Sequence, residues 1–292
     1  MIKHKTITII GGTDGIGQQI ARELVATNRV IIVGRSELKG QAFEEKFGAN
    51  AHFLQADLSD LTNVRKLAAT ISTQYQQVDF IIHTADFLST KKEVNPEGQP
   101  RSIVVNYYSR VLFNHLMLNE SKYSVERIIH VALAGFNPGK NFTKKFPADE
   151  NTSGFAIHSQ GQVSNDFYGL ALAKQLEKTS TKINILNPGL VNTNIRKKGE
   201  VPRIIKVLGS VLEVILAPFM TKVEDYAKIV LAIINNKNEF ADQYALINRK
   251  GKGIKPNRHI ANEELQQYLW NATWKVLQKN KNTDHQQLIE ES

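Results

Sequence analysis

The sequence contains no cysteine. This absence excludes a disulfide framework, a thiolate nucleophile and a metal centre with cysteine ligands. Disulfides form and persist in oxidising compartments, so a chain without cysteine fits the reducing cytoplasm, where we expect this protein to act. Any catalytic chemistry must therefore come from oxygen and nitrogen groups.

Long uninterrupted apolar runs are also absent. The N-terminal stretch MIKHKTITIIGG has an apolar run too short for a secretory signal, and we interpret it as a first strand. The most apolar later segment, residues 204–220, is interrupted by Lys206, Glu213 and Pro218. It is too short and too interrupted to cross a bilayer, so we expect no transmembrane segment.

Acidic residues are fewer than basic ones. Lysine and arginine number 37 against 28 aspartates and glutamates, which gives a formal net charge of +9. Apart from Arg196-Lys197-Lys198 and a lysine-rich C-terminal third, the basic residues are scattered along the chain. Scattered charge is typical of a solvated surface, so we expect no nucleic acid as a partner. The partner that we expect is a small-molecule substrate.

Short β-branched runs alternate with longer amphipathic segments. We predict strands at 6–10, 30–33, 52–55, 80–82, 127–131, 182–186 and 244–247. We predict helices at 17–27, 37–47, 61–75, 101–119 and 163–179. Strand followed by helix, repeated, requires right-handed crossovers and a parallel sheet covered on both faces. The expected fold is α/β, a single doubly wound Rossmann-type parallel sheet with helices on both faces, formed by residues 1–292 as one domain.

Two longer segments interrupt this alternation, at residues 135–154 and 199–220. Both would lie at the C-terminal edge of the sheet, where such folds bind ligands. We expect a substrate lid at about 196–222, whose Leu/Ile/Val content favours an apolar or bulky ligand. The same segment fits a dimer helix or a membrane-surface helix equally well. Residues from about 258 to 292 are expected to form a C-terminal helical extension.

The first predicted strand ends in IIGGTDGIG, which places Gly11, Gly15 and Gly17 at the turn into a helix. Glycines at this spacing let the backbone approach a pyrophosphate, which then lies at the helix N-terminus. A tight structural turn is the alternative. The strand before the loop, the helix after it and the β/α alternation that follows favour a nucleotide.

Arg35 follows the second predicted strand, where a dinucleotide fold selects its cofactor. An acidic residue there would bind the ribose diol, whereas an arginine accommodates the 2′-phosphate. We therefore expect NADP in preference to NAD, with a merely solvated arginine as the alternative. Asp57 and Leu58, after the third strand, fit an adenine contact, or a helix cap shared with Ser59 and Asp60.

Over residues 5–250 the chain resembles the short-chain dehydrogenase/reductase family. Its glycine loop is similar to TGxxxGIG, with Ile10 in place of the threonine, and NPGLVNTN is similar to the family's Pro-Gly-x-x-x-Thr segment. The long loop after strand five and the extension ANEELQQYLWNATWKVL are similar to the retinol-dehydrogenase-like branch. Asn106 falls on the asparagine that supports a water in the family's proton relay. The resemblance implies the following cofactor-binding residues: Gly11, Thr13, Asp14, Gly15, Ile16, Gly17, Arg35, Asp57, Leu58, Ala85, Gln162, Pro188, Gly189 and Thr193.

The family's catalytic residues are missing from their places. Its Asn-Asn-Ala-Gly after strand four is HTAD here, residues 83–86, and its substrate-binding serine is replaced by Ala132 and Leu133. Because the family's loop threonine braces the Asn-Asn-Ala-Gly turn, Ile10 and His83 are interpreted as one coupled change. The catalytic set is therefore degenerate.

The Tyr-x-x-x-Lys positions fall on His158 and Gln162 when they are counted back without a gap from the NPG motif. A register with Tyr168 in the tyrosine position fails, because no tyrosine of this chain has a lysine four residues later. Histidine titrates near neutrality, so His158 is a candidate acid/base, although a histidine near a helix start is often only a polar surface residue. Gln162 can bind ribose hydroxyls but brings no charge.

We favour an NADP(H)-binding oxidoreductase that acts on a carbonyl/alcohol pair by a mechanism without Tyr-x-x-x-Lys. A non-redox enzyme on the same fold (cyclase, isomerase or lyase) and a catalytically inactive binding partner stay open as alternatives. His83 and His130 follow neighbouring strands, but without a carboxylate pattern they do not predict a metal. The family commonly pairs two long helices between subunits, here 101–119 and 163–179, so the resemblance implies a homodimer or tetramer.

Overall fold

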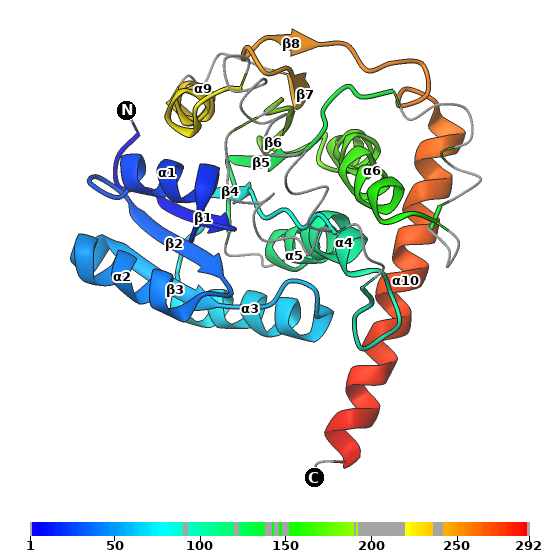
Figure 1. Ribbon diagram of the computed structural model, residues 1–292, viewed down its shortest axis with the longest axis horizontal. Helices are drawn as coiled ribbons and strands as arrows, with labels where there is room; N and C mark the ends of the chain where they lie inside the picture. The colour runs from blue at the N-terminus through cyan, green and yellow to red at the C-terminus, as the bar shows by residue number, and fades with distance from the viewer. Residues whose placement is uncertain are drawn as a thin grey trace, which may run out of the picture.

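One sheet of eight strands organises the chain (Figure 1). The computed structural model describes residues 2–89, 93–119, 123–137, 142, 146–147, 152–189, 191, 220–235 and 242–290. The strand order is β3-β2-β1-β4-β5-β6-β7-β8. The strands are β1 (Thr6–Ile10), β2 (Arg29–Gly34), β3 (Ala51–Gln55), β4 (Phe80–His83), β5 (Arg127–Val131), β6 (Lys182–Leu186), β7 (Tyr244–Ile247) and β8 (Gly253–Ile254). All pairs are parallel except β7 with β8, which is antiparallel. Strand β8 was not among the strands predicted from the sequence.

Helices cover both faces of the sheet, so the predicted doubly wound α/β fold is confirmed. On one face pack α1 (Gly15–Leu24), α2 (Glu37–Phe47) and α9 (Val223–Asn235). On the other pack α3 (Leu61–Gln74), α5 (Ser109–Leu118) and α6 (Gly154–Gln175). The short α4 (Arg101–Ile103) continues through a π-helical turn, Val104–Tyr108, into α5. The strands between these layers are buried on both faces, which explains their continuous β-branched runs.

The order of the strands sets the position of any site. The chain runs outward from β1 through β2 to β3, then returns to place β4 on the other side of β1. Such a reversal opens a crevice at the carboxyl ends of the strands, where open α/β sheets bind ligands. The glycine loop after β1 and residues 84–86 after β4 both lie at this edge.

Helix α6 begins at Gly154, well before the predicted start at Val163. Ser153 caps it by accepting a hydrogen bond from the amide of Ala156 at 3.3 Å. Glycine is a poor helix former, which is why the sequence suggested a later start. Gly161 is tolerated because α6 passes so close to Ile103 and Asn106 that a Cβ there would lie 3.3 Å from each.

The C-terminal helix α10 (Glu263–Glu290) lies along α6 in Figure 1. The Trp270 ring stacks on Tyr168 of α6, with centroids 6.1 Å apart, and Trp274 meets His115 of α5 at 4.5 Å. The outer sides of α5 and α6 are therefore contacted by a helix of the same chain.

This packing bears on the predicted pairing of subunits. In the predicted pairing helix 163–179, residues three or four apart would form an apolar stripe that ends at the charged Lys174. Two members of this stripe, Val163 and Phe167, are each 1% exposed within the single chain. Lys174, at the charged end of that stripe, forms an ion pair with Glu263 of α10 at 2.7 Å. The stripe is thus occupied inside the chain, and an oligomer would need a different surface.

A chain of buried polar side chains runs beneath the carboxyl edge of β4 and β5. His83 Nε2 lies 2.8 Å from Asn114 Oδ1, the Asn114 amide nitrogen lies 2.9 Å from His130 Nε2, and His130 Nδ1 lies 2.8 Å from Asn165 Oδ1. With this amide orientation of Asn114, His83 donates and His130 accepts. Burial lowers the pKa of His83 to about 3 and that of His130 well below its usual value, so both rings are neutral.

Two features expected from the sequence lie mostly or wholly outside the described residues. Only residues 220–222 of the expected lid are described, and Thr193 is not. None of the helices that the structure describes is long and apolar enough to cross a membrane.

The packing of α10 predicts a large effect for a substitution in its buried face. Leu269 is 1% exposed in the core that α5 and α6 share, so Leu269→Ala is expected to lower the free energy of unfolding by about 2–5 kcal/mol. The exposed neighbour Gln267→Ala is the control and should change it by less than about 0.5 kcal/mol. Urea unfolding measures both, and equal midpoints would contradict the packing of α10.

The neutral histidines predict a stability that falls in acid. The unfolded chain protonates His83 near pH 6.5, whereas the folded chain does so only near pH 3, so unfolding takes up a proton between these values. The contribution of His83 to the free energy of unfolding is therefore constant above pH 6.5. Below that pH it falls by up to about 1.4 kcal/mol per pH unit. Urea unfolding of His83→Asn between pH 7 and 4.5 should show a shallower decline. The control is His4→Asn, at an exposed position, which should leave the decline of the unfolding free energy with pH unchanged.

Candidate functional site

The glycine loop is bound directly to the segment that follows β4. The Ile10 carbonyl accepts hydrogen bonds from the Thr84 amide at 2.8 Å, the Ala85 amide at 2.9 Å and the Thr84 hydroxyl at 3.2 Å. Gly11 has φ +97°, and a Cβ on it would lie 2.4 Å from the Ala85 nitrogen. The hydroxyl that braces this turn thus comes from Thr84, which accounts for the loss of the family's threonine at Ile10.

The start of α1 carries an acidic residue paired with a lysine. Asp14 caps α1 by accepting from the Gly15 amide at 2.9 Å, and its Oδ2 lies 2.6 Å from Lys39 Nζ of α2. Thr13 is buried against Gly34, where a Cβ would lie 2.4 Å from the threonine hydroxyl. Lys39 therefore lies at the mouth of the loop as the partner of Asp14, a position that no pattern in the sequence predicted.

The ends of β2 and β3 hold the residues predicted to bind adenosine. The Arg35 carbonyl accepts from the Gln55 side chain at 3.1 Å, which places Arg35 at the carboxyl edge. Asp57 Oδ1 accepts from the Ser59 amide at 3.0 Å and hydroxyl at 2.8 Å, while the cap of α3 is Asp60. Asp57 therefore stabilises its own turn and does not cap the helix. Leu58 is buried in the core.

Asn106 lies in the π-helical turn and holds the segment after β4. Its Oδ1 accepts from the Phe87 amide at 3.0 Å, and its amide nitrogen donates to the Phe87 carbonyl at 3.0 Å. Its own carbonyl accepts from Asn165 at 3.1 Å. The family's relay asparagine thus acts here as a clamp on the backbone next to Asp86.

Arg110 lies four residues further along and is fully buried. Its Nη2 donates to the Ala85 carbonyl at 2.7 Å and its Nη1 to the Val131 carbonyl at 2.9 Å, so one guanidinium joins the ends of β4 and β5. Burial lowers its pKa to about 10, against the opposing effect of Asp86. Arg110 is therefore still a cation at neutral pH.

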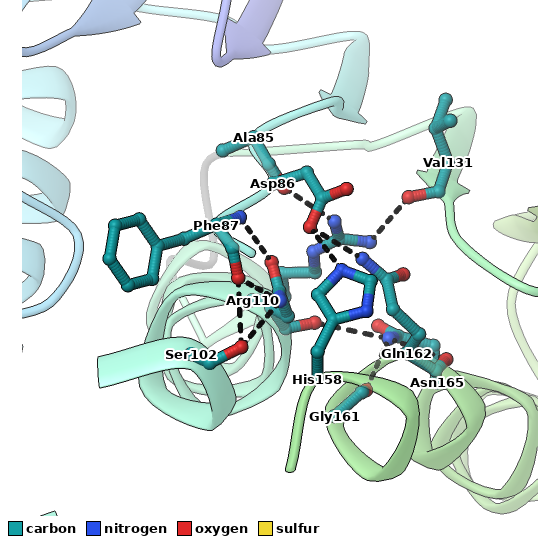
Figure 2. A network of polar contacts seen from close by, with 11 residues as sticks. Ala85, Asp86, Phe87, Ser102, Arg110, Val131, His158, Gly161, Gln162 and Asn165 are labelled. Carbon is teal, nitrogen blue, oxygen red and sulfur yellow. Dashed lines mark hydrogen bonds and ion pairs between the residues drawn. The ribbon is translucent and has the colours of Figure 1, made fainter. Parts of the chain in front are cut away.

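Asp86, His158 and Gln162 form the centre of the site (Figure 2). His158 Nε2 lies 2.8 Å from Asp86 Oδ1, and the Gln162 amide nitrogen donates to the same oxygen at 3.0 Å. Burial raises the pKa of Asp86, but the hydrogen bonds from His158 and Gln162 and the charges of His158 and Arg110 outweigh burial and lower it. The carboxyl group is ionised and accepts both hydrogen bonds.

Asp86 and Arg110 were not predicted as site residues. Asp86 was visible in HTAD as a departure from the family's glycine, and its acidic side chain next to a histidine position was the available signal. In the sequence, Arg110 cannot be told from an exposed basic residue of an amphipathic helix, although the structure buries it. No sequence feature indicated that its partners would be backbone carbonyls.

The remaining predicted residues lie at the ends of β5 and β6. Ala132 and Leu133 follow β5, and the Ala132 amide donates to the Leu186 carbonyl at 2.7 Å. Pro188 and Gly189 follow β6, and Gly189 has φ +64°. His83 and His130 do come together, with ring centroids 4.6 Å apart, but through Asn114. Within the described part of the chain no three His, Asp or Glu side chains could hold a metal.

The geometry fits a dinucleotide along this edge. Arg35 follows β2, the strand next to β1, and Lys39 pairs with Asp14 at the start of α1, so both basic residues lie at the edge where phosphates bind helix N-termini. At the other end, Gln162 Oε1 is a buried acceptor without a hydrogen-bond partner among the described residues. A ribose hydroxyl is a donor of the kind this oxygen lacks.

Comparison with known proteins agrees with this architecture. A family model for short chain dehydrogenases matches residues 5–144. An uncharacterized oxidoreductase of Saccharomyces cerevisiae is 27% identical over 282 residues, covering 91% of this chain and 86% of its own. Retinol dehydrogenase 12 of Bos taurus is 27% identical over 199 residues, covering 65% of this chain and 63% of its own.

Solved structures share the fold. The actinorhodin polyketide ketoreductase, solved with NADPH, superposes with a TM-score of 0.65 at 19% identity, covering 84% of this chain and 95% of its own. The family model over residues 5–144, the glycine loop and the strand order together support a member of the short-chain dehydrogenase/reductase family.

Proposed function

We propose that this protein is an NADP(H)-dependent oxidoreductase that acts on a carbonyl/alcohol pair, with His158 as its acid/base. One observation carries the proposal. The segment 84–86 contacts the glycine loop through Ala85 and His158 through Asp86. The dinucleotide site and the proposed proton donor are thereby joined by adjacent residues.

The cofactor proposal depends on charge. Arg35 and Lys39 would bind the 2′-phosphate, because guanidinium and ammonium groups donate strong charge-assisted hydrogen bonds to phosphate. Gly11 to Gly17 would receive the pyrophosphate and Gln162 a ribose hydroxyl. When bound, the nicotinamide would supply or accept the hydride. The solved neighbour that contains NADPH supports the same choice.

The substrate would lie between His158 and the ends of β5 and β6. Ala132 and Leu133 offer no hydroxyl there, so His158 is the described group best placed to give the substrate oxygen a proton. Phe155 lies three residues before His158, on the same side of α6, and is 68% exposed. An exposed aromatic ring at this point supports an apolar or bulky substrate.

A non-redox reaction is the second candidate. The Asp86–His158 pair is complete without a nicotinamide, and an oriented histidine can move protons in an isomerase or lyase. A requirement for NADPH in turnover separates the two candidates.

The sequence also led us to expect the cytoplasm and a homodimer or tetramer. Both stay predictions. The surface of such an oligomer would have to be other than the stripe that packs inside the chain.

Loss of one phosphate-binding cation should change cofactor preference. Arg35→Ala is expected to weaken NADPH binding by about tenfold to 100-fold, since it removes a charge-assisted hydrogen bond, and to leave NADH binding nearly unchanged. Titration calorimetry measures both dissociation constants. Lys66→Ala, at an exposed site on α3, is the matched control and should alter neither. Failure of the unmodified protein to bind either nucleotide at millimolar concentration would remove the redox proposal.

Replacement of His158 should separate catalysis from cofactor binding. His158→Phe is expected to lower kcat by about 10²-fold to 10⁴-fold, because it removes the general acid. NADPH affinity should hardly change, because the ring faces Asp86 and the substrate. Single-turnover kinetics and calorimetry make the comparison, with His259→Phe as control. Unchanged turnover in His158→Phe would rule out the acid role.

A further inference from the structure

Two departures from the family pattern meet in space. Asp86 stands where the family has glycine, and His158 stands where it has tyrosine. The carboxylate and the imidazole lie 2.8 Å apart, although they are 72 residues apart in the chain. Neither change would make this contact without the other.

The backbone on both sides of Asp86 is fixed. Arg110 holds the Ala85 carbonyl at 2.7 Å, and Asn106 holds both the amide and the carbonyl of Phe87. All three contacts come from one helical segment, 101–118, which packs between α3 and α6. The carboxylate is therefore presented to α6 by a segment that cannot readily turn away.

We propose that Asp86 is the positioning residue of His158, which it holds by Nε2 so that Nδ1 is the atom that exchanges a proton with the substrate. The proposal rests on the proposed function for its substrate, but the orientation of the ring is an independent claim. An ionised carboxylate can only accept, so Nε2 must carry the hydrogen.

The rest of the ring's surroundings agrees with this assignment. Among the described residues, no protein group is hydrogen-bonded to Nδ1 of His158. The His158 side chain is 13% exposed, so its second nitrogen can be reached from the edge of the sheet. Gln162 donates to the same Oδ1 of Asp86 and so holds the carboxylate from the next turn of α6.

The proton step follows from this orientation. In the direction of reduction, bound NADPH would supply hydride to the carbonyl carbon while the π electron pair moves to oxygen, and that oxygen takes the proton from Nδ1 of the imidazolium. The neutral ring that is left still donates Nε2–H to Asp86. In oxidation the same atom takes the alcohol proton. Asp86 itself stays ionised throughout, as an orienting carboxylate does.

Arg110, His83 and His130 are the other ionisable side chains near the Asp86–His158 pair. Arg110, packed beneath Asp86, is a cation that favours the ionised carboxylate. His83 and His130 lie deeper, and their lowered pKa values keep them neutral. Gln162 replaces the family's lysine and has no charge. The positive charge that develops on His158 therefore faces one carboxylate at hydrogen-bond distance.

The orientation is tested first, without turnover. Two-bond ¹⁵N–¹H spectra of the histidine rings at pH 8 report which nitrogen carries the hydrogen, and His158→Gln assigns the signal. The unmodified protein should show one tautomer, protonated at Nε2. Asp86→Ala should show a mixture of both tautomers. A mixture or an Nδ1–H ring in the unmodified protein would overturn the proposal.

Kinetics test the consequence. Asp86→Asn keeps the size of the side chain but no longer requires the Nε2–H tautomer, so kcat with NADPH should fall by about 10²-fold to 10⁴-fold while NADPH affinity stays within about twofold. Asp225→Asn, a surface carboxylate on α9, should be unchanged. Circular dichroism and urea unfolding confirm that Asp86→Asn is folded.

The outcomes separate the two proposals. Tautomer loss together with a lower kcat supports both. Full activity in Asp86→Asn would show that orientation by Asp86 does not matter to turnover and would overturn this inference. A fixed Nε2–H tautomer in a protein that oxidises no NADPH would support the positioning role and remove the oxidoreductase proposal.

Discussion

The guanidinium of Arg110 joins the carboxyl ends of β4 and β5 from beneath, and the geometry of the site depends on it. Its two hydrogen bonds hold the carbonyls of Ala85 and Val131, and its charge lies under Asp86. Burial removes the cation from water, and this loss of hydration lowers the pKa of Arg110, although the group stays charged at neutral pH. Two backbone carbonyls and a nearby carboxylate offset that loss.

The charges around this site are arranged differently from the family pattern. The resemblance implies a lysine at position 162, directly beside the reacting groups, but this chain has glutamine there and a cation one layer deeper at Arg110. It also adds a carboxylate at Asp86, between the two. A buried cation can hold a carboxylate in place but cannot tune a phenol. The arrangement therefore suits an oriented histidine better than a tyrosine.

Neutral polar side chains support this arrangement from below. His83, Asn114, His130 and Asn165 are bonded in series, and Asn165 also donates to the carbonyl of Asn106. Hydrogen bonds between buried side chains hold those side chains in one orientation, although His83 Nδ1 has no partner among the described residues. Rigidity here fixes Asn106, which in turn clamps Phe87 next to Asp86. The position of the Asp86 carboxylate thus depends on the hydrogen bonds of the buried core beneath it.

The sequence by itself determined the sheet and the glycine loop at its carboxyl edge. Strands such as β1 and β5 were predicted at their observed bounds, because a strand buried on both faces needs a continuous β-branched run that is easy to recognise. Only the tertiary structure decided the start of α6, where close packing of Gly161 overrides helix propensity, and the partner of His158. A contact between Asp86 and His158 depends on how β4 and α6 pack. Local patterns report the faces of single elements and carry no information on that distance.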